Sequence, residues 1–177
     1  MGAKTMQAKP MARSRASAVY PTHNDLPEDA RSSVIDLLEL RLADAIDLQT
    51  QMKQAHWNVK GPNFIALHEL FDKVNEDVEG YVDLLAERAV QLGGAVHGTA
   101  RQVASRSALP EYPAAKDGRQ HVEAVSVALA AFGKSARAGI DQSDALGDKD
   151  TADIFTEISR GVDKWLWFVE AHRQAEH

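Results

Sequence analysis

Apolar residues recur every three or four positions along four long segments of the chain, and this period most constrains its fold. At about 100° per residue in an α-helix, such residues share one face. The segments span about residues 25–57, 64–92, 117–146 and 148–170. The second shows the pattern best, with the stripe Leu67, Phe71, Val74, Val78, Val82 and Leu85. The sequence therefore predicts four amphipathic helices, and no segment indicates a strand.

Helix-breaking residues mark the ends of these segments. A Gly-Pro pair at 61–62 separates the first two helices, and a Gly-Gly pair at 93–94 ends the second. Asn24 or Asp25 is predicted to cap the first helix, because their side-chain oxygens can accept from free backbone N–H groups. The third helix is predicted to start near Asp117.

The mixed segment 95–116 is long enough to connect opposite ends of a bundle. A short helix is predicted near residues 99–105. His97 lies in this segment without acidic neighbours in the sequence and is expected to face solvent. Four helices with one long crossover between the second and third predict an all-α, ferritin-like four-helix bundle over residues 25–177.

The composition excludes several classes of protein. The 177 residues contain no cysteine, which removes disulfides, zinc–thiolate sites and cysteine nucleophiles. No apolar run approaches the roughly 18 residues that indicate a membrane span. The N-terminal segment lacks the apolar core of a secretory signal. These features predict one domain with a sizeable core and no membrane partner.

The first 24 residues differ in charge from the rest of the chain. They contain no acid and four basic residues, Lys4, Lys9, Arg13 and Arg15, whereas the remainder has 16 basic and 26 acidic residues. Such a segment buries too little apolar surface to fold alone, which predicts a flexible basic tail. It either improves solubility or binds DNA phosphates without sequence specificity, and many tails on one particle would then act together.

Nine His, Asp and Glu side chains occur between residues 56 and 87, and five of them are candidate metal ligands, namely His56, His68, Asp72, Asp83 and Glu87. The last four point about 130° away from the apolar stripe of their helix, so they face away from the chain's own core. Residues 68 and 87 are 19 positions apart, or roughly 28 Å along a helix. One metal ion therefore cannot bind both ends of the set within one chain.

The spacing of these residues is symmetric. The pairs 68/87 and 72/83 are both centred between positions 77 and 78. If two copies of the helix pair antiparallel about a two-fold axis at that point, His68 meets Glu87 and Asp72 meets Asp83 of the partner. Two identical His/Asp/Asp/Glu sites would result. The alternative is a solvated polar face, since many helices carry polar pairs four residues apart.

Three stretches of the sequence resemble those of a known family. The resemblance is carried by KQAHWNVKGPNFIALHELFD, DLLAERAVQLGG and, near the C-terminus, TADIFTEISRGVDKWLWFVEAH. These motifs are similar to those of Dps, the DNA-binding protein from starved cells, a mini-ferritin, and cover roughly residues 24–172. All five ligand positions of that family's ferroxidase pattern are filled here. The resemblance places the site between two-fold-related subunits, in agreement with the spacing.

The resemblance also implies an activity. Fe²⁺ would be oxidised by hydrogen peroxide or O₂ and stored as ferric mineral inside a hollow dodecamer in the bacterial cytoplasm, associated with the nucleoid. His68 and Asp72 of one subunit would bind iron with Asp83 and a bridging Glu87 of the other. His56 would complete a second, weaker position. Trp57, beside the site, would intercept stray oxidising equivalents or simply pack there.

Four aspartates lie between or at the start of the last helices, Asp144, Asp148, Asp150 and Asp153. In ferritin-like shells this region resembles the part that lines a three-fold pore, where rings of carboxylates would attract Fe²⁺. Asp144 and Asp153 are favoured for that role, and either Asp148 or Asp150 would join them. The alternative is turn formation and helix capping, which explains at least one of the four.

Three other interpretations compete with this one. Di-iron bundles of the larger ferritin type need Glu-x-x-His pairs, and the sequence contains none. The main alternative function is a DNA-compacting structural protein whose metal site is vestigial or structural. A plain helical interaction domain is the third possibility, and it would neither assemble nor depend on metal.

Overall fold

The computed structural model describes residues 20–174. The four tail cations Lys4, Lys9, Arg13 and Arg15 lie outside the described residues. The helices are α1 Glu28–Asn58, α2 Phe64–Gln91, α3 Ala100–Arg106, α4 Gly118–Ala145 and α5 Lys149–Glu170, followed by the 3₁₀ turn η1 Ala171–Arg173. No strand is present between residues 20 and 174. The prediction of an all-helical bundle is confirmed.

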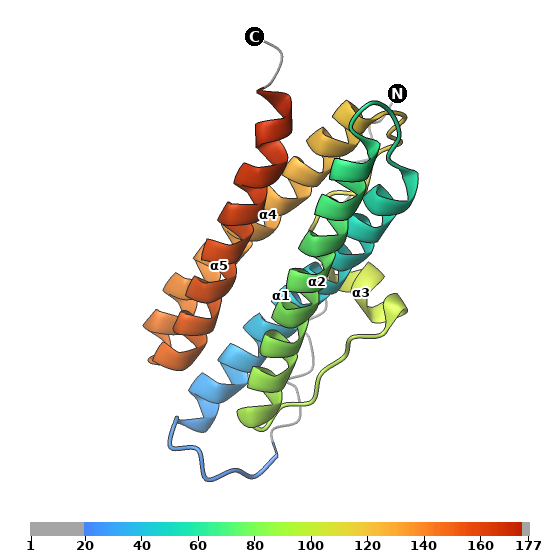
Figure 1. Ribbon diagram of the computed structural model, residues 1–177. Helices are drawn as coiled ribbons and strands as arrows, with labels where there is room; N and C mark the ends of the chain where they lie inside the picture. The colour runs from blue at the N-terminus through green and yellow to red at the C-terminus, as the bar shows by residue number, and fades with distance from the viewer. Residues whose placement is uncertain (1–19, 175–177) are drawn as a thin grey trace, which may run out of the picture.

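The four long helices form two antiparallel pairs, α1 with α2 and α4 with α5 (Figure 1). The link from α2 to α4 runs from one end of the bundle to the other and carries α3, which packs on α1. This is the predicted crossover with its short helix. Among the described residues no helix is long and apolar enough to cross a membrane.

The core lies between the four long helices and is built from the predicted stripes. Its largest fully buried side chains include Phe71, Phe132 and Phe155, one from each of three long helices. Val82, expected in the α2 stripe, is only partly buried and packs against the edge of this core. Burial of such side chains contributes about 1.5–3 kcal/mol each, which stabilises the bundle against the entropy of ordering the chain.

The helix ends follow the turn residues with one exception. Gly93 and Gly147 adopt φ of 92° and 81°, a region that favours glycine, directly after α2 and α4. Asp117 caps α4, where its side chain accepts from the backbone N–H of Gln120. The capping prediction for α1 is wrong, because Pro27 occupies the N-cap position without a side-chain bond.

Buried charge anchors the crossover to α1. The Glu39 carboxylate is buried and bonds His97 Nδ1 at 2.6 Å and Arg106 Nη1 at 3.0 Å. The expectation that His97 faces solvent is confirmed, since its side chain is about half exposed, although Glu39 also reaches it across 58 residues of sequence. The carboxylate of Asp44 accepts from the backbone of Ala108, while its burial raises its pKa. Together these contacts fix the link along α1.

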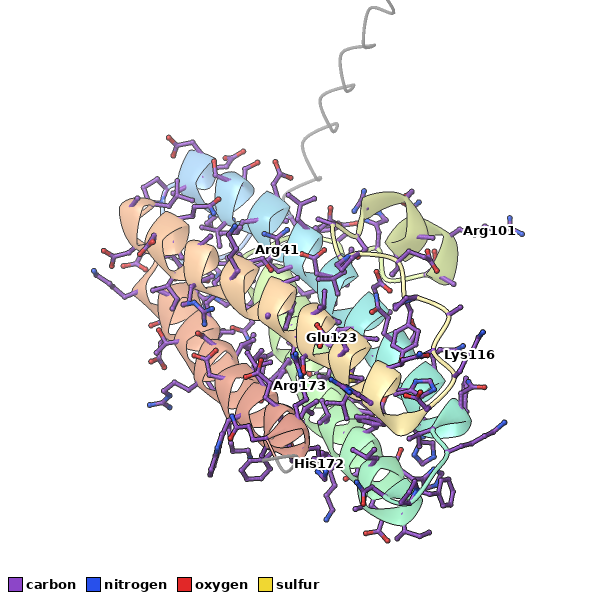
Figure 2. All side chains as sticks on the ribbon, turned by 90° about the horizontal axis from the view of Figure 1, so that it is seen from above. Arg41, Arg101, Lys116, Glu123, His172 and Arg173 are labelled. Carbon is purple, nitrogen blue, oxygen red and sulfur yellow. The ribbon has the colours of Figure 1, made fainter. Side chains whose placement is uncertain are left out.

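The other end of the chain is held to α4. Arg173 of η1 forms an ion pair with Glu123 of α4 at 2.8 Å, and Figure 2 shows the two side chains beside each other. Both side chains are about half exposed, so this pair contributes little to stability. Its effect is to direct the end of α5 toward the start of α4.

Candidate metal centre

The two predicted histidine ligands face each other across the α1–α2 turn. His56 lies in the last turn of α1 and His68 in the second turn of α2. Their rings stack, with centroids 3.7 Å apart and planes inclined by 23°. Each ring also bonds the other residue's main chain: His56 Nδ1 lies 2.8 Å from the His68 carbonyl oxygen, and His68 Nδ1 lies 2.8 Å from the His56 carbonyl oxygen.

These reciprocal bonds show that Nδ1 of each ring carries a hydrogen. A carbonyl oxygen only accepts, so each Nδ1 must carry the hydrogen. In a neutral imidazole the other nitrogen, Nε2, then keeps its lone pair. A backbone carbonyl bonded to the ring is also the arrangement that orients metal-binding histidines. The α1–α2 turn therefore presents two oriented nitrogen ligands of the type preferred by Fe²⁺ and Zn²⁺.

Asp72 completes this half of the centre. Its Oδ1 lies 3.8 Å from His56 Nδ1 and accepts a bond of 2.6 Å from Lys53 Nζ. The bond from Lys53 is the main reason that the pKa of Asp72 lies below its ordinary value, followed by the charges of His56, Lys53 and His68, while partial desolvation opposes the shift. Sequence analysis missed Lys53, whose only signal is its position three residues before His56.

Trp57 lies beside the two imidazoles in sequence but not in the core. Its side chain is 67% exposed, whereas a tryptophan recruited only for packing within the subunit would be covered. Phe64 instead packs on the imidazole of His68, with ring centroids 5.1 Å apart. The exposed indole remains accessible to solvent or to another subunit.

The remaining two ligands lie at the other end of α2. Asp83 and Glu87 are exposed and form no hydrogen bond or ion pair with the described part of the chain. Asp83 lies 11 residues beyond Asp72, or about 16 Å along the helix. The structure thus brings together His56, His68 and Asp72 but not these two carboxylates. Within residues 20–174 no three His, Asp or Glu side chains of one subunit form a group able to hold a metal.

A buried network fixes the carboxylate end of α2. Arg88, next to Glu87, is buried and bonds Asp148 Oδ1 at 2.8 Å and Thr151 Oγ1 at 3.0 Å. Asp148 also caps α5 by accepting from the Thr151 N–H. Sequence analysis missed Arg88, because a buried cation on a helix is recognised only once its partner is known.

Because of this network, the four aspartates near the α4–α5 turn do not all face outward. Asp148 is only 2% exposed and holds the capping role, so it does not present a carboxylate to a pore. Asp144 is half exposed and forms an ion pair with Lys149. Asp150 and Asp153 are exposed. The surface of this turn thus carries three of the four predicted carboxylates.

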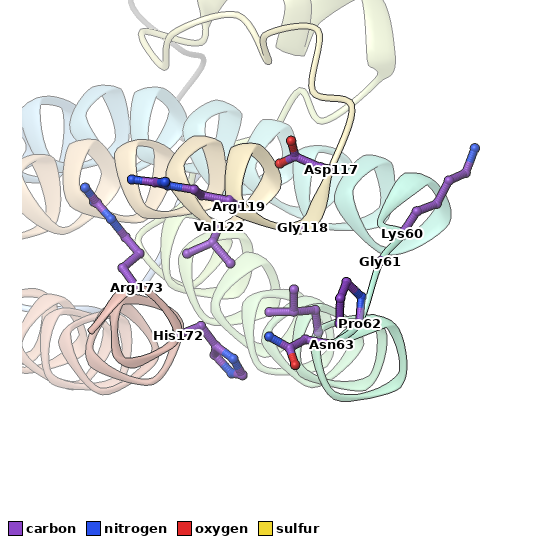
Figure 3. Close-up of a pocket in the computed structure, with 11 residues that line it drawn as sticks. Lys60, Gly61, Pro62, Asn63, Asp117, Gly118, Arg119, Val122, His172 and Arg173 are labelled. Carbon is purple, nitrogen blue, oxygen red and sulfur yellow. The ribbon is translucent and has the colours of Figure 1, made fainter. Parts of the chain in front are cut away.

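A separate hollow of about 270 Å³ lies where the α1–α2 turn, the start of α4 and η1 meet. Figure 3 shows basic side chains around it, with Lys60 extending away from Arg119 and Arg173. The one carboxylate in its wall, Asp117, is engaged in capping α4. A predominantly basic lining repels Fe²⁺, so this hollow is not the candidate metal centre.

Comparison with known proteins places this architecture in a family. Residues 35–176 match the family described as ferritin-like domain. The DNA protection during starvation protein of Agrobacterium fabrum is 46% identical over 156 residues, which cover 88% of this chain and 96% of that protein. The chain belongs to the Dps family of ferritin-like proteins.

Solved Dps structures share the fold across nearly their whole length. DpsC from Streptomyces coelicolor is 26% identical, with a TM-score of 0.86 over 94% of this chain and 98% of that one. Dps from Microbacterium arborescens, solved in a high iron form, is 33% identical, with a TM-score of 0.77 over 88% of this chain and 98% of that one. The resemblance of this chain to Dps is thus confirmed at the level of family and fold.

Proposed function

We propose that this protein oxidises Fe²⁺ at sites shared between two subunits and stores the ferric product within a hollow dodecamer. The observation that carries the proposal is the reciprocally bonded pair of His56 and His68, whose Nε2 atoms are both left as metal ligands. Membership of the ferritin-like Dps family supports iron as the substrate. The high iron form of a Dps relative is consistent with it.

The residues of one subunit supply half of the site. His68 and Asp72 bind one iron ion, and His56 offers a nitrogen for a second position. The bond between Lys53 and Asp72 holds the carboxylate ionised before iron arrives, since it lowers the pKa of Asp72. Because Lys53 occupies one carboxylate oxygen, an incoming cation at that oxygen must displace a positive charge.

The partner subunit supplies the other half. Asp83 and Glu87 are exposed carboxylates without partners within the described subunit, and their symmetric spacing brings them to His68 and Asp72 of a two-fold mate. Glu87 would bridge the two iron positions. Two Fe²⁺ ions then deliver two electrons to one hydrogen peroxide, whose O–O bond breaks to give water or hydroxide rather than free hydroxyl radical.

The first test compares peroxide-driven oxidation of Fe²⁺, followed by ferric absorbance, in wild type and Asp83→Asn/Glu87→Gln. We expect fast oxidation in the wild type and loss in the variant, because two anionic oxygen ligands are removed. The matched control is Glu76→Gln/Glu79→Gln, which makes the same charge change at exposed positions of the same helix. Equal slow rates in all three proteins would reduce the centre to a structural or vestigial site.

We further propose that the basic tail binds DNA without sequence specificity, because its four cations are followed by an acidic body. Twelve tails on one shell would bind with avidity that a single tail lacks. This activity would place the protein on the nucleoid in the cytoplasm. A truncation should end before Tyr20, whose N–H bonds the Gly93 carbonyl oxygen at 2.6 Å.

Deletion of residues 2–18 is expected to abolish DNA retardation while iron oxidation continues. A full-length variant with Lys4, Lys9, Arg13 and Arg15 changed to glutamine separates charge from length. Retention of DNA binding at low salt in either protein would exclude the tail as the binding element. Loss of oxidation in Asp83→Asn/Glu87→Gln with normal DNA retardation would establish two independent functions.

A further inference from the structure

Away from the two metal-ligand histidines, a tyrosine and a histidine form a second close pair. Tyr112 lies in the crossover and His121 in the first turn of α4. The Tyr112 hydroxyl is 2.7 Å from His121 Nδ1. Their rings are inclined by only 28°, with centroids 6.0 Å apart. The hydrogen bond joins the crossover to the bundle, and none of the residues assigned above takes part in it.

The surroundings of the pair determine whether the Tyr112 hydroxyl or His121 Nδ1 carries the proton of this hydrogen bond. His121 is 1% exposed, and this burial lowers its pKa, so the imidazole is neutral. Burial also raises the pKa of Tyr112, which keeps the phenol protonated. The Tyr112 hydroxyl therefore donates to Nδ1. The backbone of Asn58 is close enough to raise the imidazole pKa slightly, but His121 Nε2 has no hydrogen-bond partner in normal geometry among the described residues.

A structural tether alone does not account for this arrangement. A hydrogen bond between two such side chains adds only about 0.5–1.5 kcal/mol of net stability, and an apolar pair of similar shape would hold the crossover about as well. What the pair supplies is a base within proton-transfer distance of a phenol, in a setting largely shielded from water.

Tyr112 also borders the surface near the metal centre. It lines a groove of about 640 Å³ whose wall includes Trp57, the residue after the ligand His56. The exposed indole and the half-buried phenol therefore share one lining, on the side of α1 that carries α3.

We propose that Tyr112 and His121 form a redox-active pair in which one-electron oxidation of the phenol is coupled to proton transfer to the imidazole. Neutral phenol is difficult to oxidise because its radical cation is a strong acid. A base already bonded to the hydroxyl removes the proton as the electron leaves. The oxidant rests on the proposed iron oxidation: it is the hydroxyl radical made when a single Fe²⁺ reacts with peroxide in competition with the paired reaction above. The property of the pair itself does not depend on that source.

The transfer of one electron and one proton from Tyr112 conserves atoms and charge. A hydroxyl radical, formed when one Fe²⁺ reduces hydrogen peroxide by a single electron, takes one electron from Tyr112 and becomes hydroxide. The Oη–H bond breaks, and the proton moves to His121 Nδ1. The products are a neutral tyrosyl radical, an imidazolium and hydroxide. A further Fe²⁺ returns the electron and becomes Fe³⁺, and the imidazolium returns the proton.

The chain contains a matched control. Of its three tyrosines, Tyr81 is also buried, at 8% exposure, and burial raises its pKa to about 12. Its hydroxyl approaches Gly161 rather than an imidazole. Tyr20 is 61% exposed and serves as a solvent-accessible comparison. Within residues 20–174, Tyr112 is the one tyrosine that is hydrogen-bonded to an imidazole.

The test uses the whole, iron-free protein and a photogenerated oxidant. Ruthenium(II) tris-bipyridine is flashed with a cobalt(III) acceptor, and the tyrosyl radical is followed by optical and electron paramagnetic resonance spectroscopy. In Tyr20→Phe, which removes the solvent-exposed tyrosine, we expect a tyrosyl signal that persists in Tyr20→Phe/Tyr81→Phe and is lost in Tyr20→Phe/Tyr112→Phe. In His121→Gln the oxidation of Tyr112 should slow by about 100-fold, a usual contribution of a positioned base.

Two further readouts separate a redox role from a structural one. The rate of radical formation in wild type should fall in D₂O, and the high-field spectrum should show a radical that accepts a hydrogen bond. If His121→Gln fails to fold, Tyr112→Phe, which keeps the ring, still decides the outcome. A tyrosyl radical that persists in Tyr20→Phe/Tyr112→Phe, or that is lost in Tyr20→Phe/Tyr81→Phe, overturns the proposal.

The same variants are then mixed with Fe²⁺ and hydrogen peroxide. Radical formation by the photo-oxidant but not by iron and peroxide would leave the pair intact and count against the proposed iron chemistry. Normal iron oxidation with no Tyr112 radical from either oxidant would count against the pair alone. The two proposals therefore fail independently.

Discussion

The two halves of the candidate metal centre are built in opposite ways. At the α1–α2 turn, His56 and His68 stack and bond each other's main chain, and Asp72 is held by Lys53. At the other end of α2, Asp83 and Glu87 point into solvent with no bond to the described chain. One half is organised within the subunit, and the other consists of unrestrained carboxylates on a firmly fixed helix.

This difference indicates what an incoming ion meets first. Oriented imidazoles lose little conformational entropy on binding, so the histidine half can bind a cation before the partner's carboxylates close around it. Flexible carboxylates suit the second role, because a bridging oxygen must adapt as the charge of the iron changes. The predictions below test this division of labour, beginning with the largest expected effect.

The largest effect on iron oxidation should come from two variants that each lack one half of the site. His56→Ala/His68→Ala alone is expected to lower the rate of peroxide-driven iron oxidation at least about 100-fold. Even the loss of a residue that only orients a metal ligand lowers metal affinity or activity about 10–100-fold. Asp83→Asn/Glu87→Gln should do the same. When the two variants are refolded together, roughly half of the two-fold pairs are mixed, and about a quarter of all sites regain a full ligand set. Stopped-flow ferric absorbance measures the recovery.

A simple control accompanies that experiment. When wild type is mixed with a variant carrying all four substitutions, only wild-type pairs keep shared sites, about a quarter of all sites, whereas sites held within one chain would leave about half. If each chain binds iron with its own five ligands, co-refolding of the two half-site variants restores nothing. That result would remove the two-fold site.

The second effect concerns the rigidity of the carboxylate end of α2. Arg88→Met leaves Asp148 buried without its cation, and we expect the free energy of unfolding to fall by about 3–5 kcal/mol. Urea denaturation of the iron-free protein measures the change. Asp148→Asn keeps a capping oxygen for the Thr151 N–H and is the milder partner variant. Equal stability of Arg88→Met and wild type would contradict the importance of this network.

The third and smallest effect concerns Lys53. Lys53→Met removes the cation bonded to Asp72, and we expect Zn²⁺ or Co²⁺ to bind a few-fold more tightly, the scale of a partly exposed ion pair. Isothermal titration calorimetry measures the affinity. Lys60→Met, which removes an exposed cation at the α1–α2 turn, is the matched control. Unchanged affinity in Lys53→Met would show that Lys53 does not compete with the ion.

The same variant has a pH signature. The Lys53 bond holds the pKa of Asp72 below 3.8, so its contribution to stability is present above that pH and is lost as the pH falls through the lowered folded value. In Lys53→Met the pKa of Asp72 should rise toward 3.8. Carbon NMR of the Asp72 carboxyl during an acid titration of wild type and Lys53→Met follows this shift.

The helices could be predicted because their information is local. An apolar stripe of period 3.6 and a glycine after it define α2 and α4 to within a few residues, and Asp117 is a short-range capping signal. The α1 cap failed because Asn24 uses its side chain on Leu26 N–H instead, two residues before the helix starts. Such local competition among backbone donors cannot be ranked from sequence.

The candidate site was predicted in part for the same reason. The ligand types and their symmetric spacing lie on one helix and its neighbouring turn. What the sequence did not reveal are the contacts between distant segments, such as the bond from Glu39 to His97 and the network from Arg88 to Asp148. These depend on which helix faces meet, and periodicity within one helix carries no information about that. The partner's carboxylates remain a prediction of spacing and family resemblance.

The acceptors that hold His56 and His68 belong to the main chain. A carboxylate in that position could be lost by one nucleotide change, but a carbonyl oxygen is present whatever side chain its residue bears. The two carbonyl oxygens that orient the imidazoles are thus not lost when the side chain at either position changes, provided that the helical backbone there is kept. Selection needs to preserve only the imidazoles themselves, and each of them maintains the other's support.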